Sequence, residues 1–315
     1  MESSTGKDIH KRNCAACYHD STMGKRIFLF LLTNFVVVLT LSVVLNLLGV
    51  GNYVGPAGLD IQALAVFCLV WGMGGALISL QMSRWMAKRA TGVKLVDGRS
   101  GNDELDWLHA TVARLTQNAN LPMPEVGVYD SPEVNAFATG PSKSRSLVAV
   151  SSGLLRAMRR EEVEGVLAHE VAHIANGDMV TMTLLQGVMN AFVMFLARII
   201  AFALASRGDS REERGGGSSF MVVFVLQMVL GLLGSMVTAW FSRQREFRAD
   251  HGGATLAGKN QMIGALRRLA ANHNLVDTRH EALATAKISG AKGWMALLST
   301  HPPLEARIAA LERFQ

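Results

Sequence analysis

Long apolar runs separated by more polar stretches set the pattern of this 315-residue chain. A helix needs roughly 20 mostly apolar residues to cross a bilayer. Four segments meet that requirement, at 27–50, 61–82, 179–205 and 220–241. The pattern therefore predicts an α-helical membrane protein with four candidate transmembrane helices.

These spans divide the chain into five parts. Residues 1–22 are polar, and Met23 stands as a natural start just before the first apolar run, so we expect 1–22 to be a disordered extension. The first span has an apolar run longer than that of a signal peptide and is predicted to be retained. The remaining parts are a membrane hairpin, a polar part, a second hairpin and a second polar part, at 23–82, 83–178, 179–241 and 242–315.

The first polar part has the periodicity of an α+β domain. Residues 103–118 place apolar side chains on one helical face and are followed by two prolines, which predicts a helix that ends there. Three short β-prone runs follow, at 125–129, 134–139 and 146–150, and they predict a small sheet. Strong helix formers at 161–176 predict the next helix.

Composition and charge support a membrane protein. Half of the residues are hydrophobic, 18% are charged and the mean hydropathy is +0.24. The formal charge of +6 can indicate nucleic-acid binding, but Lys and Arg gather beside the apolar runs, so we expect no nucleic-acid partner. Lys25 and Arg26 precede the first span and Arg84, Lys88 and Arg89 follow the second, which by the positive-inside rule places 83–178 in the cytoplasm.

The cysteines suggest neither a disulfide framework nor a second metal site. Cys14 and Cys17 form a CxxC pair with His19 nearby, but a zinc ribbon needs a second ligand pair and none follows. Cys68 lies inside an apolar run and is expected to act as a small hydrophobe. No disulfide is predicted.

The predicted helix 161–176 contains the sequence HEVAH, from His169 to His173. Spacing of four residues puts both imidazoles on one helical face, where two nitrogens can bind one zinc ion. Glu170 lies beside the first histidine and can act as the base that takes a proton from water. The motif predicts a zinc-dependent hydrolase that needs a third ligand.

A third ligand can approach because Ala168 and Ala172 are small. The fourth span runs directly into Glu246 and Asp250, which are one helical turn apart. One carboxylate can bind zinc while the other accepts the free ring N–H of a ligand histidine. We predict Glu246 as the ligand, with His251 as a rival that points about 100° away from Asp250. The alternative is that Glu246 and Asp250 are surface charges that form ion pairs with neighbouring arginines.

Four motifs together resemble the HtpX family of bacterial membrane zinc metalloproteases, which is related to the CAAX prenyl proteases. They are the HExxH at 169–173, Glu246-Phe-Arg-Ala-Asp250, Asn135-Ala-Phe-Ala138, and His301-Pro-Pro with Arg307. The likeness covers nearly all of 23–315 and is thin at 206–219 and 272–293.

The resemblance implies a zincin-type endopeptidase with one zinc ion per subunit. It implies His169, His173 and Glu246 as ligands, Glu170 as catalytic base and Asp250 behind a ligand histidine. It also implies a site at the cytoplasmic face of the inner membrane, where misfolded membrane proteins or unfolded polypeptides are cleaved in stress-related quality control. The lipid bilayer is the other expected partner.

Three further residues are candidates for substrate or transition-state contacts. His301 or Arg307 can donate to the oxyanion, unless Pro302 and Pro303 simply start a terminal helix with Arg307 exposed. Asn135 lies in a β-prone run that forms either an edge strand or an interior strand of the predicted sheet. The family resemblance favours the edge, to which an extended substrate can add as a further strand.

An alternative from another class is a membrane scaffold or chaperone-like factor that keeps zinc for stability only. A purely structural zinc site has no need of Glu170 and is more often closed by four protein ligands. The presence of Glu170 therefore favours hydrolysis.

Overall fold

The computed structural model describes residues 43, 54–55, 58–207, 216–278 and 299–313. The chain divides into two compact units, 1–51 and 52–315, and all the elements below belong to the second. The predicted extension 1–22, its Cys14 and Cys17, and the first predicted span apart from Val43 lie outside the described residues.

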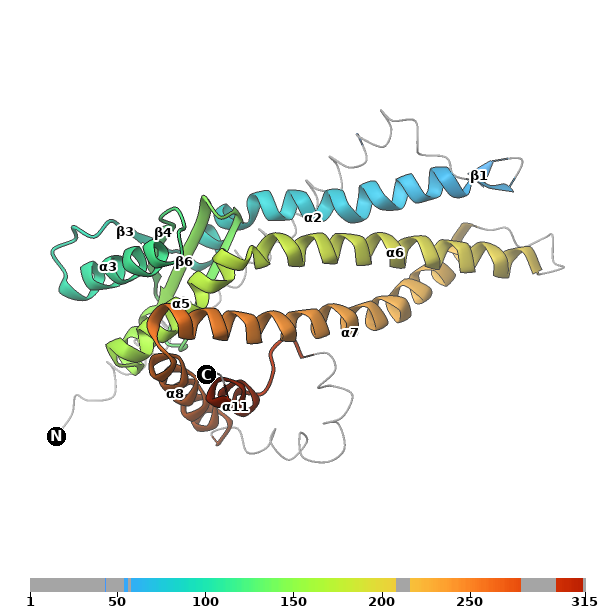
Figure 1. Cartoon of the computed structure of the whole chain (residues 1–315). Helices are drawn as coiled ribbons and strands as arrows, with labels where there is room; N and C mark the ends of the chain where they lie inside the picture. The colour runs from blue at the N-terminus through green and yellow to red at the C-terminus, as the bar shows by residue number, and fades with distance from the viewer. Residues whose placement is uncertain (1–42, 44–53, 56–57, 208–215, 279–298, 314–315) are drawn as a thin grey trace, which may run out of the picture. The chain divides into compact units, whose positions relative to one another are not determined.

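Among the described residues, three helices are long and apolar enough to cross a membrane: α2 (Ile61–Thr91), α6 (Asp178–Arg207) and α7 (Gly216–Ala257). They contain the second, third and fourth predicted spans, which are thereby confirmed as long apolar helices (Figure 1). A two-stranded hairpin of β1 (Val54–Gly55) and β2 (Gly58–Leu59) precedes α2.

Small residues bring the long helices together. A Cβ atom on Gly72 of α2 would lie 2.8 Å from the Cα of Ala191 in α6, so glycine is needed for this approach. A Cβ on Gly234 of α7 would lie 3.1 Å from Met189 of α6. Close backbone approach at small residues is typical of helix packing in membranes. The helix α7 leaves large apolar side chains exposed, among them Phe220, Phe224, Met228 and Leu232.

Outside the long helices there is a four-stranded sheet, in the order β3 (Lys94–Val96), β4 (Glu125–Tyr129), β6 (Arg145–Ser151) and β5 (Ala136–Ser142). The strands β4 and β6 run parallel, and the other two pairs are antiparallel. Within the described residues, β5 pairs only with β6 and is an edge strand, as the family resemblance implied.

Two features of the sheet differ from the sequence prediction. The short strand β3 was not predicted, because three residues carry too little periodicity. The second predicted strand, 134–139, is displaced to 136–142. Gly140, with φ of 145°, lets the chain continue through an irregularity between Thr139 and Ser142, so the strand extends beyond residue 139.

Helices α3 (Asp103–Asn118), α4 (Ser152–Ala157) and α5 (Arg160–Asn176) share the main core with the sheet. Its fully buried side chains include Leu108 and Leu115 of α3, Val148 of β6, and Leu167 and Val171 of α5. The predicted helix 103–118 is confirmed. The helix predicted at 161–176 starts one residue earlier, because the backbone N–H of Arg159 donates to the Glu162 carboxylate at 2.8 Å and so caps the first turn.

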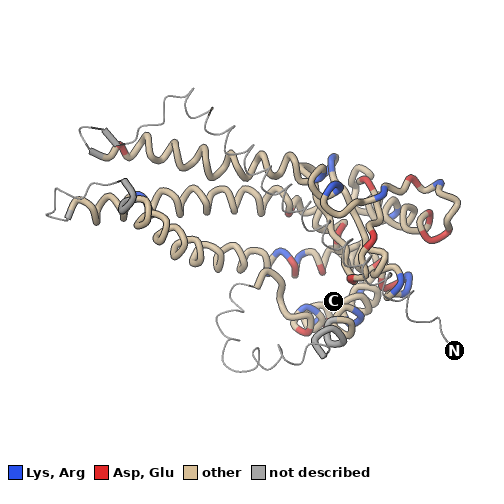
Figure 2. Tube along the Cα trace, turned by 180° about the vertical axis from the view of Figure 1, so that it is seen from behind, with Lys and Arg blue, Asp and Glu red and all other residues tan. Residues whose placement is uncertain are grey.

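The C-terminal helices α8 (Lys259–Thr278) and α11 (Leu304–Arg313) pack on the end of α7. Ala254 of α7, Met262 and Leu266 of α8, and Leu311 of α11 form this second core. Charged residues gather in the sheet and the short helices, while α2, α6 and α7 have long stretches without charge (Figure 2).

Candidate metal centre

Helix α5 carries the two histidines of the HExxH motif into the interior. His169 and His173 are 8% and 9% exposed, and their Nε2 atoms are 3.0 Å apart. The helix spacing that sequence predicted therefore does put both imidazoles on one face. Gly177, with φ of 69°, ends α5 and turns the chain directly into α6.

Two glycines let α7 reach this face. A Cβ on Gly252 would lie 2.7 Å from the Cβ of Ala172, and one on Gly253 would lie 3.1 Å from the backbone nitrogen of His169. Real Cβ atoms do not approach as closely as 2.7 Å, so only glycine fits at residue 252 without a shift. The predicted approach of another element at Ala172 is thus made by α7.

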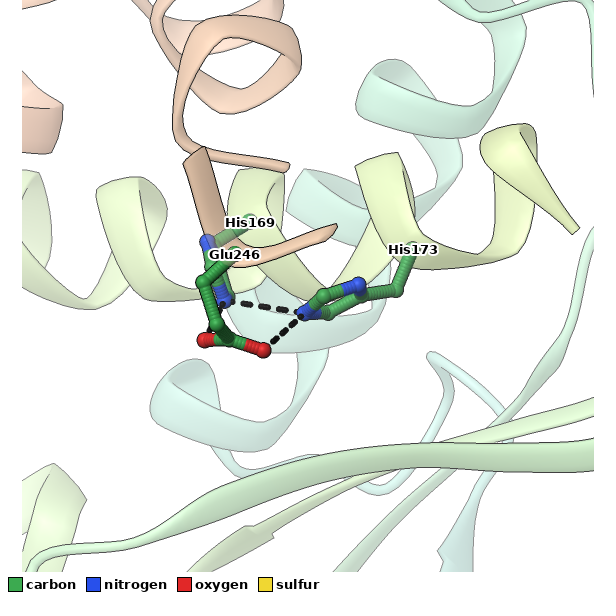
Figure 3. Close-up of side chains that lie close together, drawn as sticks. All are labelled: His169, His173 and Glu246. Carbon is green, nitrogen blue, oxygen red and sulfur yellow. Dashed lines mark hydrogen bonds and ion pairs between the residues drawn. The ribbon is translucent and has the colours of Figure 1, made fainter. Parts of the chain in front are cut away.

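Glu246 of α7 completes a cluster of three possible ligands with His169 and His173 (Figure 3). Its two carboxylate oxygens lie 3.5 Å from His169 Nε2 and 3.5 Å from His173 Nε2. One ligand atom from each residue lies within 4.8 Å of the others, so the cluster can hold a metal ion. The rival His251, which is also described, is outside this cluster.

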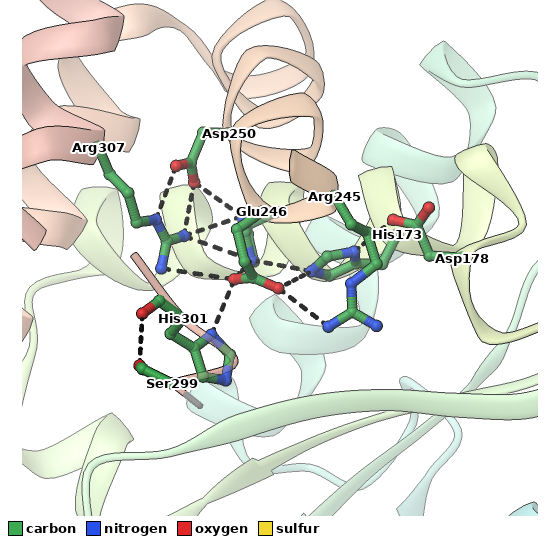
Figure 4. Close-up of polar contacts among 9 residues, drawn as sticks. His173, Asp178, Arg245, Glu246, Asp250, Ser299, His301 and Arg307 are labelled. Carbon is green, nitrogen blue, oxygen red and sulfur yellow. Dashed lines mark hydrogen bonds and ion pairs between the residues drawn. The ribbon is translucent and has the colours of Figure 1, made fainter. Parts of the chain in front are cut away.

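Each histidine meets a second carboxylate at its other ring nitrogen, and Figure 4 labels the pair His173 and Asp178. Asp250 Oδ1 lies 3.0 Å from His169 Nδ1. Asp178 Oδ2 lies 2.6 Å from His173 Nδ1, and Asp178 is 3% exposed. Sequence reasoning missed Asp178. The available signal was its place directly after the helix-ending Gly177, where a carboxylate turns back toward the last turn of α5.

Arg307 of α11 is buried beside these groups. Its Nε and Nη2 atoms donate to the two oxygens of Asp250 at 2.7 and 2.6 Å, and its Nη1 lies 3.5 Å from Glu246 Oε2. The alternative that Arg307 is an exposed helix residue is wrong, because it is 6% exposed. A bidentate pair of this kind fixes both partners.

The electrostatics of the cluster oppose the effect of burial. Burial alone would lower the pKa of His169, but hydrogen bonds to Asp250 and Glu246 raise that pKa to about 9. Burial also disfavours the charged form of Arg307, yet the Asp250 carboxylate raises the pKa of the guanidinium. In this mostly buried site, oppositely charged neighbours therefore stabilise the charged forms that burial disfavours.

A cavity of about 160 Å³ opens beside the cluster and brings together the other predicted site residues. Glu170, Asn135, His301 and Arg307 line it with His169 and Glu246. His301 Nδ1 is 3.1 Å from Glu246 Oε2, and the His301 side chain is 64% exposed. Glu170 thus faces the space next to the possible ligands without being one of them.

Comparison with known proteins gives consistent results. The model of "Peptidase family M48" matches residues 102–315. A protein named "Protease HtpX homolog" from Methylacidiphilum infernorum is 52% identical over 299 residues, which cover 92% of this chain and 99% of that protein. "Protease HtpX" from Aeromonas salmonicida is 52% identical over 292 residues, with 91% and 99% covered.

The fold also resembles a solved structure. The crystal structure of Ste24p from S. mikatae matches with a TM-score of 0.55 at 19% identity. The match covers 80% of this chain and 58% of that one. At this identity the likeness concerns the fold alone.

Proposed function

We propose that this chain, which belongs to peptidase family M48 and is an HtpX-type membrane metalloprotease, is a zinc endopeptidase that cleaves misfolded or damaged membrane proteins. The family and the hydrolase class predicted from the sequence are confirmed by the matches above. The observation that best supports the finer proposal is the convergence of His169, His173 and Glu246 beside a cavity that Glu170 lines.

The donor set suits zinc. Two imidazole nitrogens and one carboxylate are the ligands of many catalytic zinc sites, and they leave a coordination position open. His169, His173 and Glu246 would hold the ion. When bound, zinc would act as a Lewis acid on the scissile carbonyl and lower the pKa of a water molecule toward about 7.

Glu170 is the proposed general base. It lies next to His169 in α5 and lines the cavity, so its carboxylate can take a proton from the attacking water as the new C–O bond forms. Glu170 then delivers this proton to the amide nitrogen as the C–N bond breaks. The carboxylate is thereby restored at the end of each cycle.

His301 and Arg307 receive different roles in this proposal. Arg307 is committed to Asp250 through two short hydrogen bonds and is buried, which suits a residue that holds Asp250 against His169. His301 is largely exposed at the mouth of the cavity, so its ring can move toward a substrate. We therefore assign His301 as the donor to the oxyanion of the transition state.

The edge strand β5 is the proposed binding track for the substrate. A polypeptide in extended form can add to an edge strand through backbone hydrogen bonds, which depend little on sequence. Asn135, just before β5, and Ala136, its first residue, line the cavity, so such a peptide would pass the metal cluster. Recognition of extended backbone favours unfolded substrates over folded ones and suits quality control.

The proposed location is the cytoplasmic face of a bacterial inner membrane, in a multi-pass chain. Arg84, Lys88 and Arg89 lie at the end of α2 near the sheet, while the Asp60 end has no Lys or Arg among residues 54–55 and 58–60 of the described chain. This bias supports a cytoplasmic site by the positive-inside rule.

One experiment tests the proposal as a whole. The full chain, purified in detergent, is stripped with a chelator, reloaded with zinc and given an unfolded protein such as casein. We expect cleavage to disappear on stripping and to return with zinc. Cleavage that persists without metal, or no cleavage at full zinc occupancy, would refute the zinc endopeptidase.

A further inference from the structure

Two tryptophans lie where long apolar helices approach the sheet and the short helices. Trp85 of α2 and Trp240 of α7 are both about half exposed, and Arg89 lies over the Trp85 ring at 5.7 Å from its centroid. The helix before each tryptophan, 61–84 in α2 and 216–239 in α7, is long enough at roughly 1.5 Å per residue to cross a hydrocarbon core of roughly 30 Å. Tryptophan is enriched at the headgroup level of membranes. Groups beside this end of α2 therefore lie among lipid headgroups.

The turn between β5 and β6 contacts this end of the long helices. Its residues 142–145, Ser-Lys-Ser-Arg, are called the basic turn below. Arg145 Nη2 donates to Gln81 Oε1 of α2 at 3.3 Å. A Cβ on Gly177, at the junction of α5 and α6, would lie 4.0 Å from Cε of Lys143. Figure 2 shows Lys and Arg gathered where the sheet meets the end of α2. The basic turn therefore lies at the headgroup level that Trp85 marks.

The hairpin of β5 and β6 holds the basic turn in place. Ser146 Oγ donates to the backbone carbonyl of Lys143 at 3.0 Å, which closes the turn. Leu147 of β6 is fully buried, and Ala87 of α2 packs against the cluster that contains it. The position of the turn relative to α2 is thus set by packing of the strands on that helix.

The surface around the basic turn has an excess of positive charge. Arg84 and Lys88 of α2 share one carboxylate, that of Glu125, at 3.4 and 2.5 Å. Lys143 and Arg145 are exposed, and neither forms an ion pair with a carboxylate of the described residues. Four cations therefore face a single carboxylate in this part of the described chain.

An anionic phospholipid is the partner that fits this surface. A Lys or Arg close to a membrane strengthens binding to anionic lipid by about 5-fold. A phosphate also accepts short, charge-assisted hydrogen bonds from both kinds of side chain. The basic turn has no apolar side chain, and Lys and Ser are depleted at protein–protein interfaces, so a protein partner fits less well.

We propose that the basic turn binds the phosphate of an anionic phospholipid through Lys143 and Arg145. The bound lipid anchors the hairpin of β5 and β6 to the leaflet in which this end of α2 lies. Since β5 is the proposed track for the substrate, the same contact holds that track at the membrane surface. This last consequence rests on the proposed endopeptidase function, whereas lipid binding itself does not.

Lipid retention by the purified full chain tests the site directly. The chain in detergent is mixed with equal amounts of dioleoylphosphatidylglycerol and dioleoylphosphatidylcholine, and native mass spectrometry identifies the bound lipid. We expect phosphatidylglycerol to be retained at least about 10-fold over phosphatidylcholine, because two cations act together. Equal retention overturns the proposal. Displacement of the lipid by free glycerol phosphate also overturns it, since the site would then serve a soluble phosphate.

Charge variants show whether the lipid binds at the basic turn. Lys143→Gln combined with Arg145→Gln should lower the lipid preference about 10-fold. Arg99→Gln combined with Arg156→Gln is the matched control, because it removes the same charge from exposed residues before α3 and in α4. Lys143→Arg combined with Arg145→Lys keeps the charge and should keep the preference. An unchanged preference in the first pair, or a loss in either of the others, contradicts the assignment.

Activity in nanodiscs separates this inference from the proposed function. Casein cleavage by the zinc-loaded chain is compared in phosphatidylcholine nanodiscs with and without phosphatidylglycerol. We expect the anionic lipid to lower KM at least about 2-fold in the unmodified chain but not in the double glutamine variant. Cleavage without any lipid preference overturns the lipid site and leaves the protease intact. Lipid preference without cleavage at full zinc occupancy overturns the protease and leaves the lipid site.

Discussion

At the scale of single residues, every proposed ligand is held by a different side chain. Asp250 contacts His169, Asp178 contacts His173, and Arg245 Nη2 donates to Glu246 Oε1 at 3.0 Å. Such partners orient a ligand and set which histidine nitrogen is free to bind metal. The three contacts explain why substitutions outside the proposed ligand set should still change metal binding.

The role of Glu170 gives the first prediction. Glu170→Gln should retain zinc at the level of the unmodified chain but lower kcat by about 10²–10⁴-fold, because the amide keeps the shape and cannot accept the proton. Metal content by plasma mass spectrometry and casein cleavage are measured on the same preparation. Loss of zinc together with activity would instead identify Glu170 as a ligand.

The choice of third ligand gives the second prediction. Glu246→Ala should lower zinc occupancy sharply, while Asp250→Ala should reduce metal affinity by about 10–100-fold, as removal of a ligand's partner typically does. His251→Ala serves as the control and should keep nearly full zinc. Full zinc in Glu246→Ala with loss in His251→Ala would reverse the assignment.

Asp178 gives a third prediction, on a residue that sequence reasoning missed. Asp178→Asn removes the charge that faces His173 Nδ1 and should weaken zinc binding by about 10-fold or more, measured by chelator competition. Asp130→Asn is the control, because Asp130 is exposed and contacts Ser152 away from the cluster. Unchanged affinity in Asp178→Asn would remove Asp178 from the site.

At the scale of elements, the packing of α7 against α5 brings the ligands together. Glu246 reaches the histidines because α7 continues without a break from its apolar stretch to Ala257. The approach is limited by Gly252, which lies against Ala172, and by Gly253, which lies against the His169 backbone. Formation of the metal cluster therefore depends on two glycines, which contribute no ligand but allow α7 to pack closely against α5.

Gly252→Ala tests this dependence. The added methyl should clash with Ala172, destabilise the chain by about 1–3 kcal/mol and reduce zinc occupancy, as measured by thermal unfolding in detergent and by metal analysis. Gly231→Ala in the same helix is the matched control, since nothing lies within 4 Å of its added methyl. If both variants behaved like the unmodified chain, the close approach would not be required.

At the scale of the whole molecule, two apolar helices meet the metal cluster directly. Asp178 is the first residue of α6, and Glu246 lies in α7 beyond its most apolar stretch. If both helices span the bilayer, as proposed, the site lies at the membrane surface. Membrane-embedded substrates would then reach it where their chains leave the lipid.

The orientation of the chain in the membrane gives the last prediction. Segments 83–178 and 242–315 should both be cytoplasmic, because one metal cluster takes residues from each. Protease added outside intact bacterial cells should cut neither segment, whereas the same protease should cut them in inside-out vesicles. Cleavage of either segment in intact cells would contradict this topology.

The sequence alone determined the local features of this protein, and tertiary structure decided the contacts between distant elements. Local sequence patterns are sufficient to predict three of the long apolar helices and the helix at 103–118. They are also sufficient to place His169 and His173 on one helical face. The cluster formed by His169, His173 and Glu246 was also anticipated, because the motif chemistry requires a third ligand. The sequence did not predict every pairing between a carboxylate and a histidine of the site. The contact of Asp178 with His173 and the burial of Arg307 depend on how α5, α6, α7 and α11 pack, and no local pattern encodes that packing.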